Sequence, residues 1–203
     1  MRKIFIILAA LPFCAFSQDK MSFGIIAGAN FANVTGTSSI TRSNSSGYMV
    51  GAFIAPPSKG LMSMRTEFIY SRQGYDYKTN SNAGSVDLSY VMMPTLMGIR
   101  IGKFALIQGG LQMAYLLNAK VDTSNQTGNA QIDAMMGMMN RFNYGIGAGL
   151  QIYPYKGIII GTRYNIALNQ TYKQFDPNTP PPSFIPDVDT KHNLLQIFLG
   201  YKF

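Results

Sequence analysis

The 203-residue chain is poor in several residue types, and each shortage narrows the classes of protein to which it can belong. It has one cysteine, Cys14, and one histidine, His192, so a disulfide framework is excluded and histidine chemistry is confined to one position. Its 17 lysines and arginines form no cluster, which argues against a nucleic-acid-binding face. Beyond the N-terminal segment no run of 18 apolar residues occurs, so no membrane-spanning helix is expected there.

The first 17 residues have the features of a cleavable signal peptide. Arg2 and Lys3 form a basic start, an apolar run follows, and the stretch ending at Ser17 resembles a cleavage site. We expect residues 1–17 to be removed on export and residues 18–203 to form one domain. The alternative is an N-terminal anchor that is retained. The exported chain would have 15 basic and 9 acidic residues, a net charge near +6 that suits either anionic lipid headgroups or simple solubility.

Eight stretches of the exported chain have the length and side-chain alternation of β-strands. In residues 141–153, apolar side chains alternate with polar side chains and glycines, and residues 61–73 and 157–169 repeat this pattern. One face of each strand is therefore apolar and the other carries charges, amides or glycine. The eight expected strands are residues 22–32, 47–55, 61–73, 85–101, 104–120, 141–153, 157–169 and 193–203.

The connections between these stretches alternate between long and short. The short ones are residues 56–60, 102–103 and 154–156, and the long ones are residues 33–46, 74–84, 121–140 and 170–192. A soluble β-sandwich would show the same side-chain alternation, but transmembrane barrels combine short periplasmic turns with long external loops. We therefore expect an all-β, eight-stranded, antiparallel up-and-down transmembrane β-barrel with both termini at the periplasmic side.

The spacing of glycine and aromatic residues resembles that of a known family. The segments TEFIYSRQG, FALIQGGLQMAYLLNAK, NYGIGAGLQIYPYKGIIIGTRYNIALN and FLGYKF are similar to the PorT-type, porin-like outer-membrane barrels of the Bacteroidetes, within the OmpA-like eight-stranded superfamily. Leu199, Tyr201 and Phe203 resemble the C-terminal signal of outer-membrane barrels, which implies recognition by the barrel assembly machinery. The resemblance also implies an outer-membrane location, contact with lipids and lipopolysaccharide, and a link to protein secretion.

The stretch 85–101 does not keep one pattern along its length. We expect its apolar residues Leu88, Tyr90 and Met92 to face lipid. Arg100 has the same parity and should face inward. A β-bulge near Met93–Pro94 would switch the facing of the strand, since proline cannot donate a hydrogen bond to a neighbouring strand.

A barrel of eight strands has an interior that side chains can fill. Because an unpaired charge in a narrow lumen is costly, we expect Glu67 to pair with Arg65 or Arg163. Gly145, Gly147 and Gly149 leave space for the larger side chains. The alternative is a narrow conduit for small anions. The expected polar cluster of the lumen consists of Arg65, Glu67, Gln108, Gln112, Gln151, Arg163 and Asn165.

Candidate catalytic groups are few. His192 lies at the edge of the last long connection, near Asp187, Asp189 and Ser183, and such groups can activate water or attack an acyl group. A loop of this length also brings polar residues together by chance, so we expect no enzymatic activity and no bound metal. The GIGAG stretch continues a strand and has no βαβ surroundings, so no dinucleotide or other cofactor is expected.

Two long connections carry apolar residues that would lie at the rim of the barrel. They either pack over the mouth or form a soft docking surface for another protein. We therefore expect a structural or accessory component of the cell envelope, with other envelope proteins among its partners. A small-solute channel and a lipid-active enzyme are the alternatives. The candidate docking residues are Met135, Met136, Met138, Met139, Phe184 and Ile185.

Overall fold

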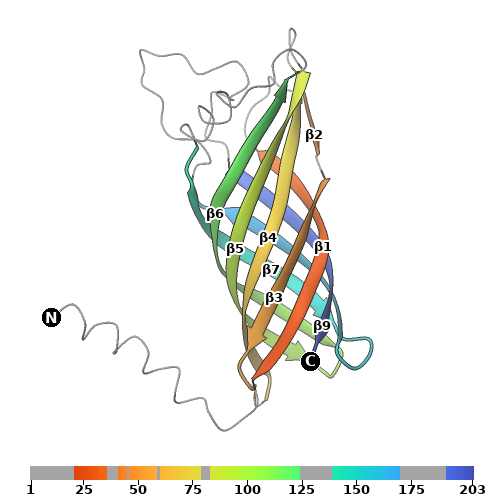
Figure 1. Ribbon diagram of the computed structural model, residues 1–203. Coiled ribbons are helices and arrows are strands. Elements are labelled where there is room, and N and C mark those ends of the chain that lie inside the picture. Colours follow the sequence, from red (N-terminus) through yellow and green to blue (C-terminus); the bar gives the residue numbers. More distant parts are fainter. Residues whose placement is uncertain are drawn as a thin grey trace, which may run out of the picture.

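Antiparallel pairing joins every strand of the computed structural model, which describes residues 21–35, 41–44, 46–58, 60–78, 83–123, 139–169 and 191–203 (Figure 1). β1 pairs with β3, each strand from β3 to β9 pairs with the next one along the chain, and the pairing of β1 with β9 closes a barrel of eight strands. Among the described strands, the short strand β2 pairs only with β4. The strands are β1 (Ser22–Thr35), β2 (Thr41–Asn44), β3 (Ser46–Ala55), β4 (Met62–Lys78), β5 (Ala83–Ile101), β6 (Ala105–Thr123), β7 (Phe142–Ile152), β8 (Ile158–Ala167) and β9 (Lys191–Lys202). None of the described segments is a helix long and apolar enough to cross a membrane.

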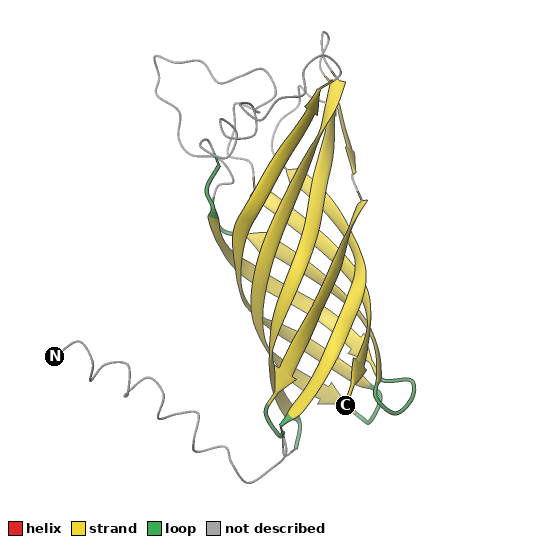
Figure 2. Cartoon of the chain, in the orientation of Figure 1, coloured by secondary structure: helices red, strands yellow, loops and turns green. Residues whose placement is uncertain are grey.

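The two ends of the barrel differ. Residues 56–61, 102–104 and 153–157 form the three connections at the end where Phe203 lies, here called the turn end (Figure 2). Each contains a glycine with a positive φ, 94° at Gly60, 61° at Gly102 and 78° at Gly157, which residues with a side chain rarely adopt. The opposite end of the barrel is called the loop end. The predicted eight-stranded antiparallel barrel is thus confirmed.

Several strands, among them β4, β5 and β6, extend farther toward the loop end than the sequence indicates. The prediction of a long connection at residues 74–84 is wrong, because β4 and β5 stay paired from Gly74 opposite Asp87 to Lys78 opposite Ala83. The short strand β2, which was not predicted, pairs with this extension of β4. Glycine and polar residues hide the extension in the sequence, whereas backbone hydrogen bonds between neighbouring strands hold it in the structure. Figure 1 shows β4, β5 and β6 rising above the rest of the barrel.

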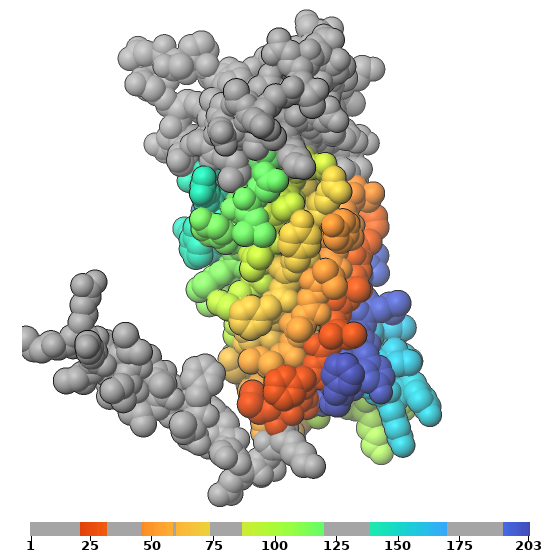
Figure 3. All heavy atoms as spheres, viewed as in Figure 1, coloured from red at the N-terminus to blue at the C-terminus, as the bar shows by residue number. Residues whose placement is uncertain are grey.

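Large apolar side chains cover the outside of the barrel. On β9, Leu195, Leu199 and Tyr201 are exposed, and the even-numbered residues of β7 and β8 are exposed in the same way. Figure 3 shows the continuous wall that the strands form. A soluble β-sandwich buries its apolar face, so this arrangement contradicts that alternative and matches a barrel surrounded by lipid. The predicted facing of β7, β8 and β9 is confirmed.

The facing of β5 corrects the prediction of a bulge near Met93–Pro94. Leu88, Tyr90 and Met92 are buried and face the lumen, as the even-numbered residues beyond Pro94 do. The register shift lies instead between Ser89–Asn118 and Tyr90–Leu116, which leaves one extra residue, Leu117, on β6. Both faces of β5 are apolar here because this part of the lumen is itself apolar, so alternation in the sequence did not indicate which face points inward.

Candidate functional site in the barrel lumen

Three charged side chains meet inside the barrel. Glu67 on β4 is fully buried, and Arg65 on β4 and Arg163 on β8 are 6% and 1% exposed. Arg163 donates two hydrogen bonds to the carboxylate, from Nη1 to Oε2 at 2.9 Å and from Nη2 to Oε1 at 2.7 Å. Arg65 donates from Nε to Oε1 at 2.6 Å, and its Nη2 also forms an ion pair with Oε1. The expectation that Glu67 pairs with Arg65 or Arg163 is met by both arginines.

The order of the strands makes this cluster a bridge across the lumen. Around the closed sheet, β4 and β8 are separated by three strands on either side, so they stand opposite each other. Arg65 and Glu67 point inward because they share the parity of the buried residues of β4, and Arg163 does so on β8. The ion pair between Glu67 and Arg163 therefore joins opposite walls of the barrel.

Aromatic rings complete the surroundings of the two guanidinium groups. Cζ of Arg65 lies 4.5 Å from the centre of the Phe53 ring, and Cζ of Arg163 lies 5.3 Å from that of Phe198. Such contacts between a cation and an aromatic ring stabilise a desolvated charge. Gly161 leaves room for one ring, because a Cβ atom there would lie 2.4 Å from Cζ of Phe198.

An amide layer adjoins the charged cluster on its loop-end side. Asn165 Nδ2 donates to Gln196 Oε1 at 2.9 Å, and Gln196 Nε2 donates to Asn30 Oδ1 at 3.1 Å. Asn30 Nδ2 in turn donates to Ser71 Oγ at 2.8 Å, as does Gln73 Nε2 at the same distance. The chain of amides runs from β8 through β9 and β1 to β4, so it also reaches from one wall of the lumen to the opposite wall.

A second set of amides lies on the turn-end side of the cluster. Arg65 Nη1 donates to Gln151 Oε1 at 3.2 Å, and Gln151 Nε2 donates to Gln108 Oε1 at 3.0 Å. The hydroxyl of Tyr153 also donates to Gln151 Oε1, at 3.1 Å. Through these bonds the ion pairs, the amides and the tyrosine form one connected network. None of its members is arranged as a nucleophile with a neighbouring base.

The structure places five of the seven predicted polar residues, Arg65, Glu67, Gln108, Gln151 and Arg163, in this network. Asn165 belongs to the amide layer. Gln112 faces inward, but its Oε1 has no partner among the described residues. The sequence prediction missed Ser71, Gln73 and Tyr153 and did not single out Gln196. The alternation of β4 and β9 is the signal that could have found Ser71, Gln73 and Gln196. Gly147 leaves space as expected, because its Cβ would lie 2.4 Å from Asn165 Oδ1.

The other predicted positions lie largely outside the described part of the chain. Of the docking residues only Met139 is described; it is fully buried in the core cluster, so it offers no exposed docking surface. His192 is described only as a backbone position of β9, paired with Val34. Within the described ranges, no three His, Cys, Asp or Glu residues gather as metal ligands would. The positions outside the described residues are Met135, Met136, Met138, Ser183, Phe184, Ile185, Asp187 and Asp189.

Comparison with solved structures supports the same fold. Ail of Yersinia pestis, solved in complex with the heparin analogue sucrose octasulfate, is 17% identical, with 91% of this chain and 100% of the Ail chain covered and a TM-score of 0.53. Neisserial surface protein A is 13% identical, with 91% and 100% covered and a TM-score of 0.55. The comparison with curated protein sequences finds no match.

Comparison with protein families gives the assignment. The model of the family described as outer membrane protein beta-barrel domain matches residues 16–173, which is more than half of the chain. The closed barrel, its apolar outer wall and the polar cluster in its lumen agree with that description. The chain therefore belongs to the outer membrane protein β-barrel domain family.

Proposed function

We propose that this outer-membrane β-barrel protein is a structural or accessory component of the cell envelope, that its turn end faces the periplasm, and that it acts through its two ends rather than through its lumen. The observation that carries the proposal is the bonding of Glu67 to Arg65 and Arg163, which links opposite walls of the barrel. A solute on its way through the lumen would have to separate buried charges, which is costly.

Three features outside the lumen fit this role. The apolar outer wall provides the contact with outer-membrane lipids and lipopolysaccharide. The barrel assembly machinery would recognise Leu199, Tyr201 and Phe203. All three side chains are exposed, the first two on the outer face of β9 and the third directly after its end. Residues 1–17 would be removed on export.

More specifically, we propose that the protein is an accessory component of a protein-secretion assembly. This rests on the resemblance of the glycine and aromatic spacing to PorT-type barrels, and the long connections at the loop end provide the surface for a partner. Fold alone does not fix such a role, so it needs a direct test.

The test is extraction of a tagged copy from its native outer membrane in a mild detergent, followed by identification of the proteins that stay bound. Stoichiometric envelope proteins are expected to co-purify with the wild type. A variant with Phe184→Ser and Ile185→Ser should lose them while it still folds as a barrel. An unrelated tagged outer-membrane barrel, extracted in parallel, controls for proteins carried over with lipid. Recovery of the barrel alone, even after cross-linking in intact cells, would contradict an accessory role.

A narrow anion-selective channel is the second candidate. It is favoured by the charge of the cluster, where two guanidinium groups face one carboxylate. Such a channel would give a reversal potential of anion-selective sign under a KCl gradient, and Arg65→Gln would move that potential toward zero. An unchanged reversal potential in this variant would remove the cluster from any conduction path.

A further inference from the structure

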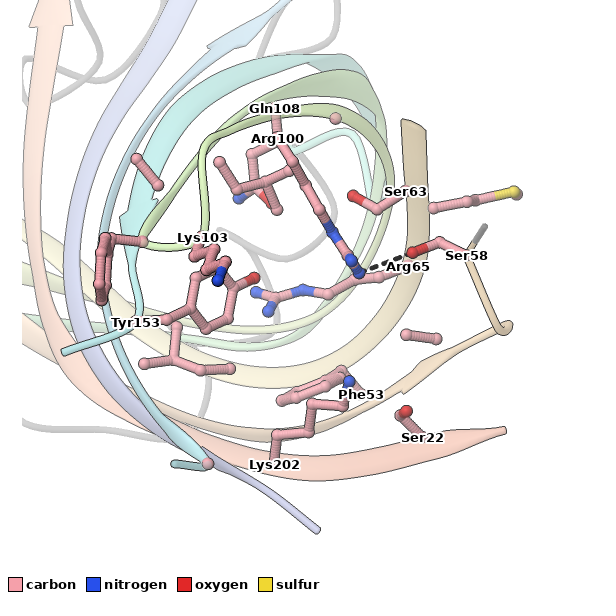
Figure 4. Close-up of a pocket in the computed structure, with 18 of the residues that line it drawn as sticks. Ser22, Phe53, Ser58, Ser63, Arg65, Arg100, Lys103, Gln108, Tyr153 and Lys202 are labelled. Atoms are coloured by element: carbon pink, nitrogen blue, oxygen red, sulfur yellow. Dashed lines mark hydrogen bonds between the residues drawn. The ribbon is translucent and has the colours of Figure 1, made fainter. Parts of the chain in front are cut away.

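A cavity of about 720 Å³ opens at the turn end of the barrel, next to the charged cluster (Figure 4). The three short connections, residues 56–61, 102–104 and 153–157, contribute to its rim, and Arg65 lies at its inner end. Its volume is in the range of about 300–1,000 Å³ that is typical of sites for small molecules. The cavity is therefore large enough for a molecule bigger than a single inorganic ion.

The charged side chains that line this cavity have one sign. They are Arg65, Arg100, Lys103, Lys156 and Lys202, and no acidic residue is among the described residues that line it. The sequence shows why, because each of the three short connections contains one lysine and no aspartate or glutamate. Glu67, the carboxylate of the adjoining charged cluster, is already bonded to two arginines. The described side chains that line the cavity therefore carry positive charge without an acidic side chain among them.

Polar groups in the cavity wall also have hydrogen-bond donors that are not used within the described residues. Gln108 is 3% exposed and uses Oε1 to accept a hydrogen bond from Gln151, but its Nε2 has no partner among the described residues. Arg100 Nη2 donates one hydrogen bond, to Ser58 Oγ at 2.6 Å, so the other N–H groups of its guanidinium are not used by that contact. Figure 4 shows Arg65, Arg100, Lys103 and Tyr153 arranged around the same space.

Several cations with spare N–H donors and no carboxylate define the chemistry of a ligand. Guanidinium and ammonium groups bind phosphate and sulfate oxygens through strong charge-assisted hydrogen bonds. A ligand with a single phosphate or sulfate group would leave most of the cavity empty and several of its cations without a partner. We propose that this cavity is a binding site for a small soluble molecule with two or more phosphate or sulfate groups, which enters from the turn end.

The test uses inorganic pyrophosphate as the probe. Titration calorimetry of the folded full-length barrel in an uncharged detergent is expected to show saturable binding of one pyrophosphate. Replacing Arg100→Gln and Lys103→Gln together should weaken that binding at least tenfold. Both side chains are exposed, so this variant should keep the fold. Binding that is absent, or not weakened by this variant, would overturn the proposal.

A matched control separates a site from general attraction between charges. Arg72 and Arg141 are exposed and lie toward the loop end, so Arg72→Gln with Arg141→Gln removes the same charge away from the cavity. This control should bind pyrophosphate like the wild type, and equal weakening in both variants would contradict a localised site. The side-chain amide signal of Gln108 in NMR spectra should shift with pyrophosphate and not with chloride of equal ionic strength. A Gln108 signal that does not move would also overturn the proposal.

Discussion

Glu67 is in contact with guanidinium groups from both sides of the lumen, and its own side chain is fully buried. A buried carboxylate without partners would be strongly disfavoured, and two buried arginines without it would be worse. The phenyl rings of Phe53 and Phe198 lie against the two guanidinium groups. The three charges therefore depend on one another, and removal of one leaves the others uncompensated.

The change Glu67→Gln tests this dependence. It leaves two buried guanidinium groups without a carboxylate, and we expect a loss of about 3–5 kcal/mol in the free energy of unfolding. Urea unfolding of the barrel folded into lipid vesicles measures it. The control is Asp87→Asn, which removes the exposed ion pair between Arg72 Nη2 and Asp87 Oδ2 at 2.5 Å and should cost about 0–1 kcal/mol. Equal losses in the two variants would show that the buried cluster does not stabilise the barrel.

Gly161 offers a second test at a single residue. The change Gly161→Ala places a Cβ atom 2.4 Å from Cζ of Phe198, so the ring must move within a filled lumen. Overpacking of this kind should cost about 1–3 kcal/mol in the same unfolding assay. Gly109→Ala is the matched control on a neighbouring part of the barrel, since the nearest atom to its Cβ would be 3.5 Å away. If both substitutions have the same effect, Phe198 is not held by close packing against Gly161.

Among the strands, the register between β5 and β6 determines which side chains of β5 lie on the outer face of the barrel. The extra residue Leu117 on β6 absorbs the register shift, so β5 keeps one facing from Leu88 to Gly98. Pro94 remains in register with Gln112, although it has no N–H to donate. Val91 and Met97 are consequently exposed on the outer face, on either side of the proline.

The facing of β5 can be tested with single tryptophans, because the chain contains none. Val91→Trp and Met97→Trp should both be strongly quenched by brominated lipids, whereas Tyr90→Trp should be protected inside the lumen. Tryptophan fluorescence of each variant in vesicles with and without brominated lipid measures this. A switch of facing at Met93–Pro94 would give a different result, in which Tyr90→Trp and Met97→Trp are quenched and Val91→Trp is protected.

The sequence was sufficient to predict the eight strands of the barrel and the outward faces of β7, β8 and β9, because there one face is apolar and the other polar. It failed on β5, where Leu88 faces the lumen and Val91 faces outward although both are apolar. It did not show β2, which is short and depends on the extension of β4 for its partner. The alternation of side chains predicted that Glu67 and Arg163 face the lumen. Their contact across the lumen also depends on how the strands are aligned with one another, and alternation alone does not predict that alignment.

At the scale of the whole molecule, three levels follow one another from the turn end to the loop end. The turn end holds the basic cavity, and the middle holds the charged cluster with its amides. Beyond them toward the loop end, the described residues of the lumen are mainly apolar, with Leu88, Ala119 and Met139 buried there. A chain of hydrogen bonds leads from Asn165 through Gln196 and Asn30 to Ser71 and joins opposite walls of the barrel. The hydrogen bonds from Arg163 to Glu67 also join opposite walls. We infer that these side chains close the lumen of the barrel.

Whether the lumen is closed can be measured as the conductance of the purified barrel in planar lipid bilayers. We expect the wild type to insert without steady ion conductance, because ions cannot pass the bridge between Glu67 and Arg163 without separating it. Membrane insertion is checked in parallel by protection of the strands from protease. A stable conductance in the wild type, with anion selectivity that Arg163→Gln abolishes, would contradict the closed lumen and identify the protein as a channel.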